Sequence, residues 1–95
     1  MDTKEIKIGD KIVQGYEIKM PNAMLVLAIA AKGYVICGYL NMETADKLGD
    51  CAAVVTGVSS IDELLSKNVV KVSASAKVKG IEPGMSGLSA LSKMF

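Results

Sequence analysis

The stretch from residue 23 to residue 40 constrains the fold more than any other part of this chain. It is apolar or glycine apart from Lys32, and its length approaches the roughly 20 residues of a membrane-spanning helix. However, Lys32-Gly33 near its middle is typical of a tight turn, and the flanking runs are rich in Val, Ile and Ala at strand length. The stretch therefore predicts two buried strands joined by a turn, and we expect no membrane partner.

The rest of the chain predicts more strands. They are expected at residues 3–8, 11–20, 52–58 and 69–72. In the second of these, Ile12, Tyr16 and Ile18 share one face, predicted to be buried, while Lys11 and Glu17 share the other, predicted to face water. The two strands within residues 23–40 are apolar on both sides, so we expect them to be central and covered on both faces.

Short helices are predicted in the second half. Asn41 is a candidate N-cap for a helix at residues 42–48, Ser60 opens a second helix, residues 73–79 form a third, and Ser86 caps a last one. Residues 1–95 are therefore expected to form a single domain of α+β (mixed α/β) class. We expect a single sheet of about five to six strands, with an N-terminal antiparallel meander and helices packed on at least one face.

Two missing residue types exclude several functions. The chain has no His, and its eleven basic residues are all Lys. Catalytic triads, Cys-His dyads and His-based zinc sites are thereby excluded, as is bidentate anion recognition by Arg. The formal net charge is only +1, so we expect no nucleic-acid partner. The charged N-terminus does not resemble a signal peptide, and a cytoplasmic location with reduced thiols is expected.

Two segments form a recognisable pattern. Residues 32–41 read KGYVICGYLN, and residues 80–87 read GIEPGMSG, with AVVTGV at residues 53–58 between them. In this order and spacing the chain resembles the YunC-type family of domains of unknown function over nearly its whole length. The resemblance implies a small α+β protein without an established activity. In that family an Arg-Glu pair often follows the Gly-Met-Ser-Gly segment, whereas Leu88-Ser89 stand there in this chain.

Cys37 and its neighbourhood form the first candidate site. Cys37 is either a nucleophilic thiol beside Gly38, where a ligand approaches the backbone, or a small buried hydrophobic residue, and the second interpretation is favoured. Gly38 and Gly57 each end an apolar strand and either line one crevice or mark close packing. Asn41 either presents its amide to a ligand or only caps a helix, and capping is favoured.

The segment before the last helix is the second candidate site. It consists of Gly84, Met85, Ser86 and Gly87. Its backbone N–H groups either bind an anion at the helix N-terminus or belong to a capped loop, and the loop is favoured. Three carboxylates at positions 43, 46 and 50 are expected to face solvent. We therefore expect no metal and no cofactor.

The apolar strands need more cover than these short helices supply, so we expect a homo-oligomer, either a dimer or a trimer. The favoured function is a non-catalytic oligomeric module that binds a small molecule or a protein partner. The alternative is a small enzyme that uses Cys37 as nucleophile or thiol acid/base, with backbone N–H donors near Gly84 and Gly87.

Overall fold

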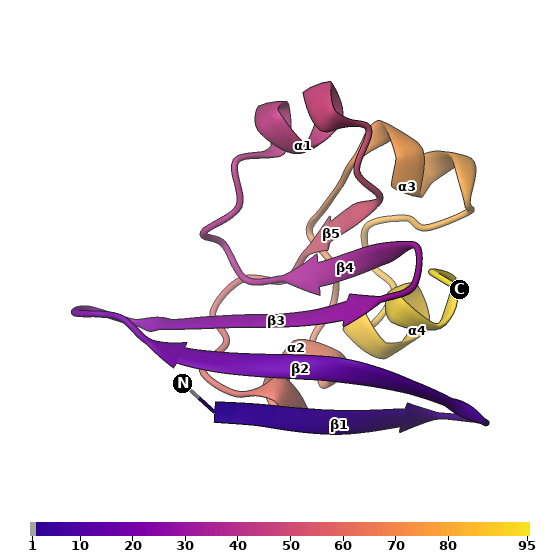
Figure 1. Cartoon of the computed structure of the whole chain (residues 1–95). Helices are drawn as coiled ribbons and strands as arrows, with labels where there is room; N and C mark the ends of the chain where they lie inside the picture. The colour runs from indigo at the N-terminus through magenta and orange to yellow at the C-terminus, as the bar shows by residue number, and fades with distance from the viewer. Residues whose placement is uncertain (1) are drawn as a thin grey trace.

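The alternating and apolar runs of the first half form four consecutive strands. The computed structural model describes residues 2–95 (Figure 1). The strands are β1 (Asp2–Ile8), β2 (Lys11–Lys19), β3 (Met24–Ala30), β4 (Gly33–Ile36), β5 (Ala52–Val54) and β6 (Lys71–Val72). They form one sheet in sequence order, in which β1 to β4 are an antiparallel meander, β4 and β5 are parallel, and β6 is antiparallel to β5. The predicted α+β class and meander are confirmed.

Four short helices follow the meander in the described residues. They are α1 (Met42–Leu48), α2 (Ile61–Ser66), α3 (Ala74–Val78) and α4 (Gly87–Ser92). Their N-caps are Asn41, Ser60, Ser73 and Ser86, and each cap side chain accepts a backbone N–H of the first turn. Gly49, at φ 74°, ends α1 in the left-handed conformation that glycine adopts without strain. Over residues 2–95, none of the helices has the length and hydropathy needed to cross a membrane.

The main core lies between the sheet and the helices α2 and α4. Ile61 and Leu64 of α2, together with Leu91 of α4, are at most 2% exposed. A backbone hydrogen bond of 2.8 Å from Lys32 to the carbonyl of Met94 ties the end of the chain to the β3–β4 turn. Each such buried aliphatic side chain contributes about 1.5–3 kcal/mol to stability, so these two short helices hold the fold together despite their length.

Two expectations about the faces of the sheet are wrong. On β2 the predicted outer face points to the helices: Val13 is 1% exposed, while Ile12, expected inside, is 56% exposed. Gly15 explains the inversion, because a Cβ at this position would lie only 2.9 Å from Cδ1 of Ile61, so glycine makes room for α2. Glu17 also points to this side and accepts the backbone N–H of Ile61 at 2.8 Å.

The strand β3 is covered on one face rather than on two. Val26 and Ala28 are fully buried on the side of the helices, whereas Ile29 on the other side is 45% exposed. The side chains of β3 are apolar on both faces of the sheet, but the helices α2 and α4 pack on only one of these faces. An uncovered apolar face therefore remains on the sheet.

Candidate functional site

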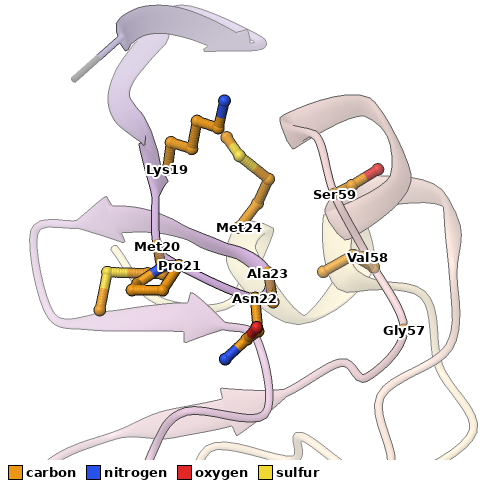
Figure 2. A pocket seen from close by; sticks show the side chains of 9 residues that line it. All are labelled: Lys19, Met20, Pro21, Asn22, Ala23, Met24, Gly57, Val58 and Ser59. Carbon is orange, nitrogen blue, oxygen red and sulfur yellow. The ribbon is translucent and has the colours of Figure 1, made fainter.

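Two adjoining cavities lie between the turn from β2 to β3 and the loop from β5 to α2. Their volumes are about 490 Å³ and about 310 Å³. Both are lined by Ala23, Gly57 and Val58, so they form one depression, which we call the Val58 groove. The larger cavity is also lined by Lys19, Met20, Pro21, Asn22, Met24 and Ser59, and the smaller by Cys37, Gly38 and Tyr39. Figure 2 shows the side chains around the larger cavity.

One wall of the groove is the β2–β3 turn. Pro21 cannot donate a backbone hydrogen bond and ends the strand pattern of β2. The backbone N–H of Met20 donates to the carbonyl of Ala23 at 2.8 Å, which closes the turn. In Figure 2, Ala23 and Met24 lie across the hollow from Val58. The turn thus presents small and apolar side chains to the cavity.

The opposite wall is the loop from Gly57 to Ser59, and side chains of α2 and its C-cap anchor it. Lys67 Nζ donates to the carbonyl of Gly57 at 2.7 Å. Glu63 Oε1 accepts both the backbone N–H of Ser59, at 3.0 Å, and its hydroxyl, at 2.8 Å. These bonds from Ser59, helped by Lys67, hold the pKa of Glu63 below its usual value. The wall is therefore held in place without a ligand, as in most small-molecule sites.

Cys37 lies just after the end of β4, and its thiol faces the backbone of β3. The backbone N–H of Cys37 donates to Val26 at 2.9 Å, and the backbone N–H of Val26 points at Cys37 Sγ at 3.4 Å. The thiol in turn points at the carbonyl of Met24, 3.9 Å away. Only 4% of the residue is exposed. Cys37 thus packs as a small buried group that forms part of the floor of the smaller cavity.

The groove is mostly apolar, with three polar side chains among the residues that line its larger cavity (Figure 2). Lys19, Asn22 and Ser59 supply an ammonium, an amide and a hydroxyl to the larger cavity, and none of the lining residues carries a carboxylate. In Figure 2, Lys19 runs beside Met24 at the edge of the hollow. Such a lining suits a ligand with an apolar body and an end that is anionic or accepts hydrogen bonds.

The structure brings together three of the residues singled out from the sequence. Cys37, Gly38 and Gly57 line the smaller cavity side by side. Asn41 is not among the lining residues of either cavity; its Oδ1 accepts the backbone N–H groups of Glu43 and Thr44 at the start of α1. The sequence therefore locates one part of the groove through its strand-end glycines.

The second predicted site, residues 84–87, is engaged in hydrogen bonds within the protein. The backbone N–H of Gly84 donates to Val69 at 2.8 Å, and that of Gly87 donates to Lys67 at 3.0 Å. Ser86 Oγ caps α4 by accepting the backbone N–H of Ser89. Neither these described residues nor Met85 lines either part of the Val58 groove. The N–H donors of Gly84 and Gly87 are thus already used inside the fold.

Sequence reasoning missed the residues that join the two cavities. Ala23 and Val58 are small apolar residues in loops, a type that carries no chemical signal. The available signal in the sequence is Pro21-Asn22, a pair that indicates the end of a strand and a turn. Since that turn lies opposite the Gly57 loop only after the sheet has formed, pairing the two required the strand order.

The fold and the groove define a small α+β protein with a mixed six-stranded sheet and an apolar cleft at the strand ends. Residues 36–94 match the model of a domain of unknown function, DUF1805. The uncharacterised protein YunC of Bacillus subtilis (strain 168) is 35% identical over 82 residues, which cover 82% of this chain and 81% of the relative. The chain therefore belongs to the DUF1805 family.

A solved structure shows the same fold. The crystal structure of a protein of unknown function, TA1206 from Thermoplasma acidophilum, matches with a TM-score of 0.94 and 40% sequence identity. The match covers 99% of this chain and 92% of that one. The similarity extends over the whole sheet and its helices, so the arrangement described above is shared by a solved relative.

Proposed function

We propose that this chain is a non-catalytic module that assembles as a homo-oligomer and binds a small molecule in the Val58 groove. The observation that carries the proposal is the groove itself: an anchored, mostly apolar depression whose two cavities have the volumes of small-molecule sites. A protein partner would need a larger and flatter surface than this groove. A small molecule is therefore favoured over a protein as its ligand.

The chemistry of the groove supports binding rather than catalysis. The chain has no His, and the thiol of Cys37 is directed at backbone groups of β3. The enzyme alternative also needs free N–H donors near Gly84 and Gly87, and those two donors bond to Val69 and Lys67. Among the described residues, those that line the smaller cavity with Cys37 include no Lys and no carboxylate, so the parts of a thiol enzyme are not found beside the thiol.

A fluorescence titration tests the groove. The probe 1-anilinonaphthalene-8-sulfonate has an apolar ring system and one anionic group, which matches the lining. We expect saturable binding to the wild type, weakened at least about tenfold by Ala23→Phe, because the added ring obstructs the groove at a residue that lines both cavities. The matched control is Ala31→Phe, since Ala31 is an exposed alanine of the next hairpin turn and lines neither cavity. Equal affinities for the wild type and Ala23→Phe would remove the groove as the binding site.

The oligomer is tested separately by light scattering. The monomer has a mass of 10.0 kDa, and we expect a species of two or three times that mass at micromolar concentration. A monomer at every concentration would contradict assembly and leave the binding result untouched.

A further inference from the structure

Charge is unevenly distributed between the two cavities of the Val58 groove. Among the described residues that line either cavity, Lys19 is the only one with a charged side chain, and it lines the larger cavity alone. The smaller cavity is lined by Cys37, Gly38 and Tyr39 and by the three residues that the cavities share, with no Lys and no carboxylate among them. The groove therefore has one cationic end and one end without a charged side chain.

The ammonium of Lys19 is available to a ligand. Lys19 is the last residue of β2 and is exposed, and the ion pairs found in residues 2–95 involve Lys4 and Lys67 instead. A lysine acts as a single point charge, whereas dianionic phosphate groups are commonly held by the fork of an Arg. The chain has no Arg. The cationic end thus matches a ligand with one negative charge.

The opposite wall of the larger cavity does not suit an anion. The backbone N–H and the hydroxyl of Ser59 both donate to Glu63 Oε1, at 3.0 Å and 2.8 Å. With these donors in use, Ser59 can only accept a further hydrogen bond, and the carboxylate of Glu63 beside it repels a second negative charge. An anionic group in the groove is therefore expected on the side of Lys19.

A passage leads from Lys19 toward the smaller cavity. In Figure 2 the ammonium of Lys19 lies at the top of the view and Gly57 lies lower, with Met24 and Val58 between them. The residues shared by the two cavities are Ala23, Gly57 and Val58, which have small side chains or none. The smaller cavity, of about 310 Å³, has room for at most roughly ten methylene groups, if each takes about the 30 Å³ of a water molecule. An unbranched chain fits such a path.

We propose that the Val58 groove binds an unbranched aliphatic monocarboxylate of about eight to twelve carbons. Its carboxylate, which is ionised at neutral pH, pairs with Lys19, and the end of its chain lies in the smaller cavity against Cys37. Apolar walls along the passage bury the methylene groups, and each buried methylene tightens binding about fourfold. The inference rests on the proposed function and names the ligand class of the same groove.

Competition with the naphthalene probe tests the class of ligand. Hexanoate, octanoate and decanoate are titrated below their micelle concentrations, together with decylamine, which has the same chain and the opposite charge. We expect the dissociation constant to fall about fourfold per added methylene, and decylamine to bind at least about fivefold more weakly than decanoate. Equal affinities for decanoate and decylamine, or for hexanoate and decanoate, would overturn the inference.

Lys19→Glu tests the position of the carboxylate. Because the substitution inverts the charge at the cationic end, decylamine should bind more tightly than decanoate. Lys71→Glu is the matched control: Lys71 is an exposed lysine on β6 that lines neither cavity, and the net charge changes by the same amount. This control should keep the preference of the wild type, and circular dichroism confirms that both variants fold. If Lys19→Glu also keeps that preference, Lys19 does not hold the carboxylate.

Tyr39→Trp tests the position of the chain. The protein has no Trp, and Tyr39 lines only the smaller cavity, so the substitution gives a single fluorophore there. Decanoate should shift its emission to shorter wavelength, whereas hexanoate, at a concentration that displaces the same fraction of the naphthalene probe, should shift it less. Displacement of the probe by decanoate without any change in this emission contradicts the placement of the chain.

The outcomes separate this inference from the proposed function. Probe binding that Ala23→Phe weakens, but that none of the carboxylates displaces, overturns the ligand class while the groove stands as a small-molecule site. Probe binding that Ala23→Phe leaves unchanged is a failure of the proposed function itself, and it is measured before any carboxylate is added.

Discussion

Gly87 marks a close approach of α4 to the backbone of α2, and its replacement gives the sharpest stability prediction. A Cβ at this position, the first residue of α4, would lie 2.0 Å from the carbonyl oxygen of Leu64 and 3.3 Å from Cα of Leu65. The obstruction is backbone, so no rotamer change relieves it. In Gly87→Ala the helix α4 must withdraw from α2 by about 1 Å, in an interior packed as densely as an organic crystal.

The expected cost follows from that displacement. Overpacking a core typically costs about 1–3 kcal/mol, and a clash with backbone belongs at the upper end. We therefore expect Gly87→Ala to lower the free energy of unfolding by about 3 kcal/mol and the Tm by roughly 12–24 °C. Thermal and urea unfolding followed by circular dichroism measure both quantities.

Gly38→Ala is the control for this experiment. Its new Cβ would lie 3.5 Å from Cγ2 of Thr56, an ordinary contact, so the change should stay within about 0.5 kcal/mol. If Gly87→Ala remains within 1 kcal/mol of the wild type, taken here as about the smallest overpacking cost, then α2 and α4 do not approach as described. The contrast also separates a glycine required for packing from one that is only next to the groove.

Three further predictions concern the side chains of Ser73, Tyr34 and Cys37. Ser73→Ala should cost about 2–3 kcal/mol in urea unfolding, because Ser73 Oγ is buried and makes three hydrogen bonds to the backbone; an equal loss in Ser75→Ala, which removes one exposed bond, would contradict this. Burial and the hydrogen bond to Asp50 raise the pKa of Tyr34 to about 12. Since Tyr34 ionises near pH 10 when unfolded, stability should fall as pH rises from 10 to 12, and Tyr34→Phe should make that fall shallower in pH-dependent unfolding. In a variant without the other cysteine, iodoacetamide should alkylate Cys37 at least about 100-fold more slowly in the folded protein than in urea, and fast alkylation of the folded protein would favour the enzyme alternative.

Local signals predicted the elements of this fold well. The helix α1 has the predicted bounds because Asn41 and Gly49 mark its two ends by side-chain capping and a left-handed φ. At the predicted helix start, Ser60 accepts the N–H of Glu63, while the Glu63 side chain accepts the N–H of Ser59. The geometry of a helix cap depends on residues that are close in the sequence, so the sequence alone predicts it.

The faces of the sheet were not predictable in the same way. On β2 the apolar side chains at Ile12 and Tyr16 outnumber those on the opposite side, which carries Glu17. The helix α2 determines which face of β2 is buried, because its Ile61 packs over Gly15. Glu17, on the same face, accepts the backbone N–H of Ile61. Lys4 adds an ion pair to Glu17 at 3.7 Å. Ile61 lies 44 residues from Glu17 in the sequence, so the periodicity of β2 alone does not reveal this contact.

The candidate site was only partly visible for a related reason. Gly38 and Gly57 were noticed because glycine at a strand end is unusual, and both line the groove. Gly84 and Gly87 were singled out instead as N–H donors before the last helix, but Gly84 is required there by its positive φ of 100° and Gly87 by its contact with Leu64. Glycine thus reports a backbone constraint, and only tertiary structure shows whether that constraint serves a cavity or a packing contact.

The order in which this sheet is built affects how the protein is made on the ribosome. Strands β1 to β4 pair with their neighbours in sequence, so the meander can form while the second half is still being synthesised. Its helix-facing side, however, is closed by Leu91 and Met94, both fully buried near the end of the chain. Until those residues leave the exit tunnel, a nascent meander exposes apolar side chains on both faces. Synthesis therefore includes an interval in which the half-made sheet is a substrate for chaperones and for association with its own copies.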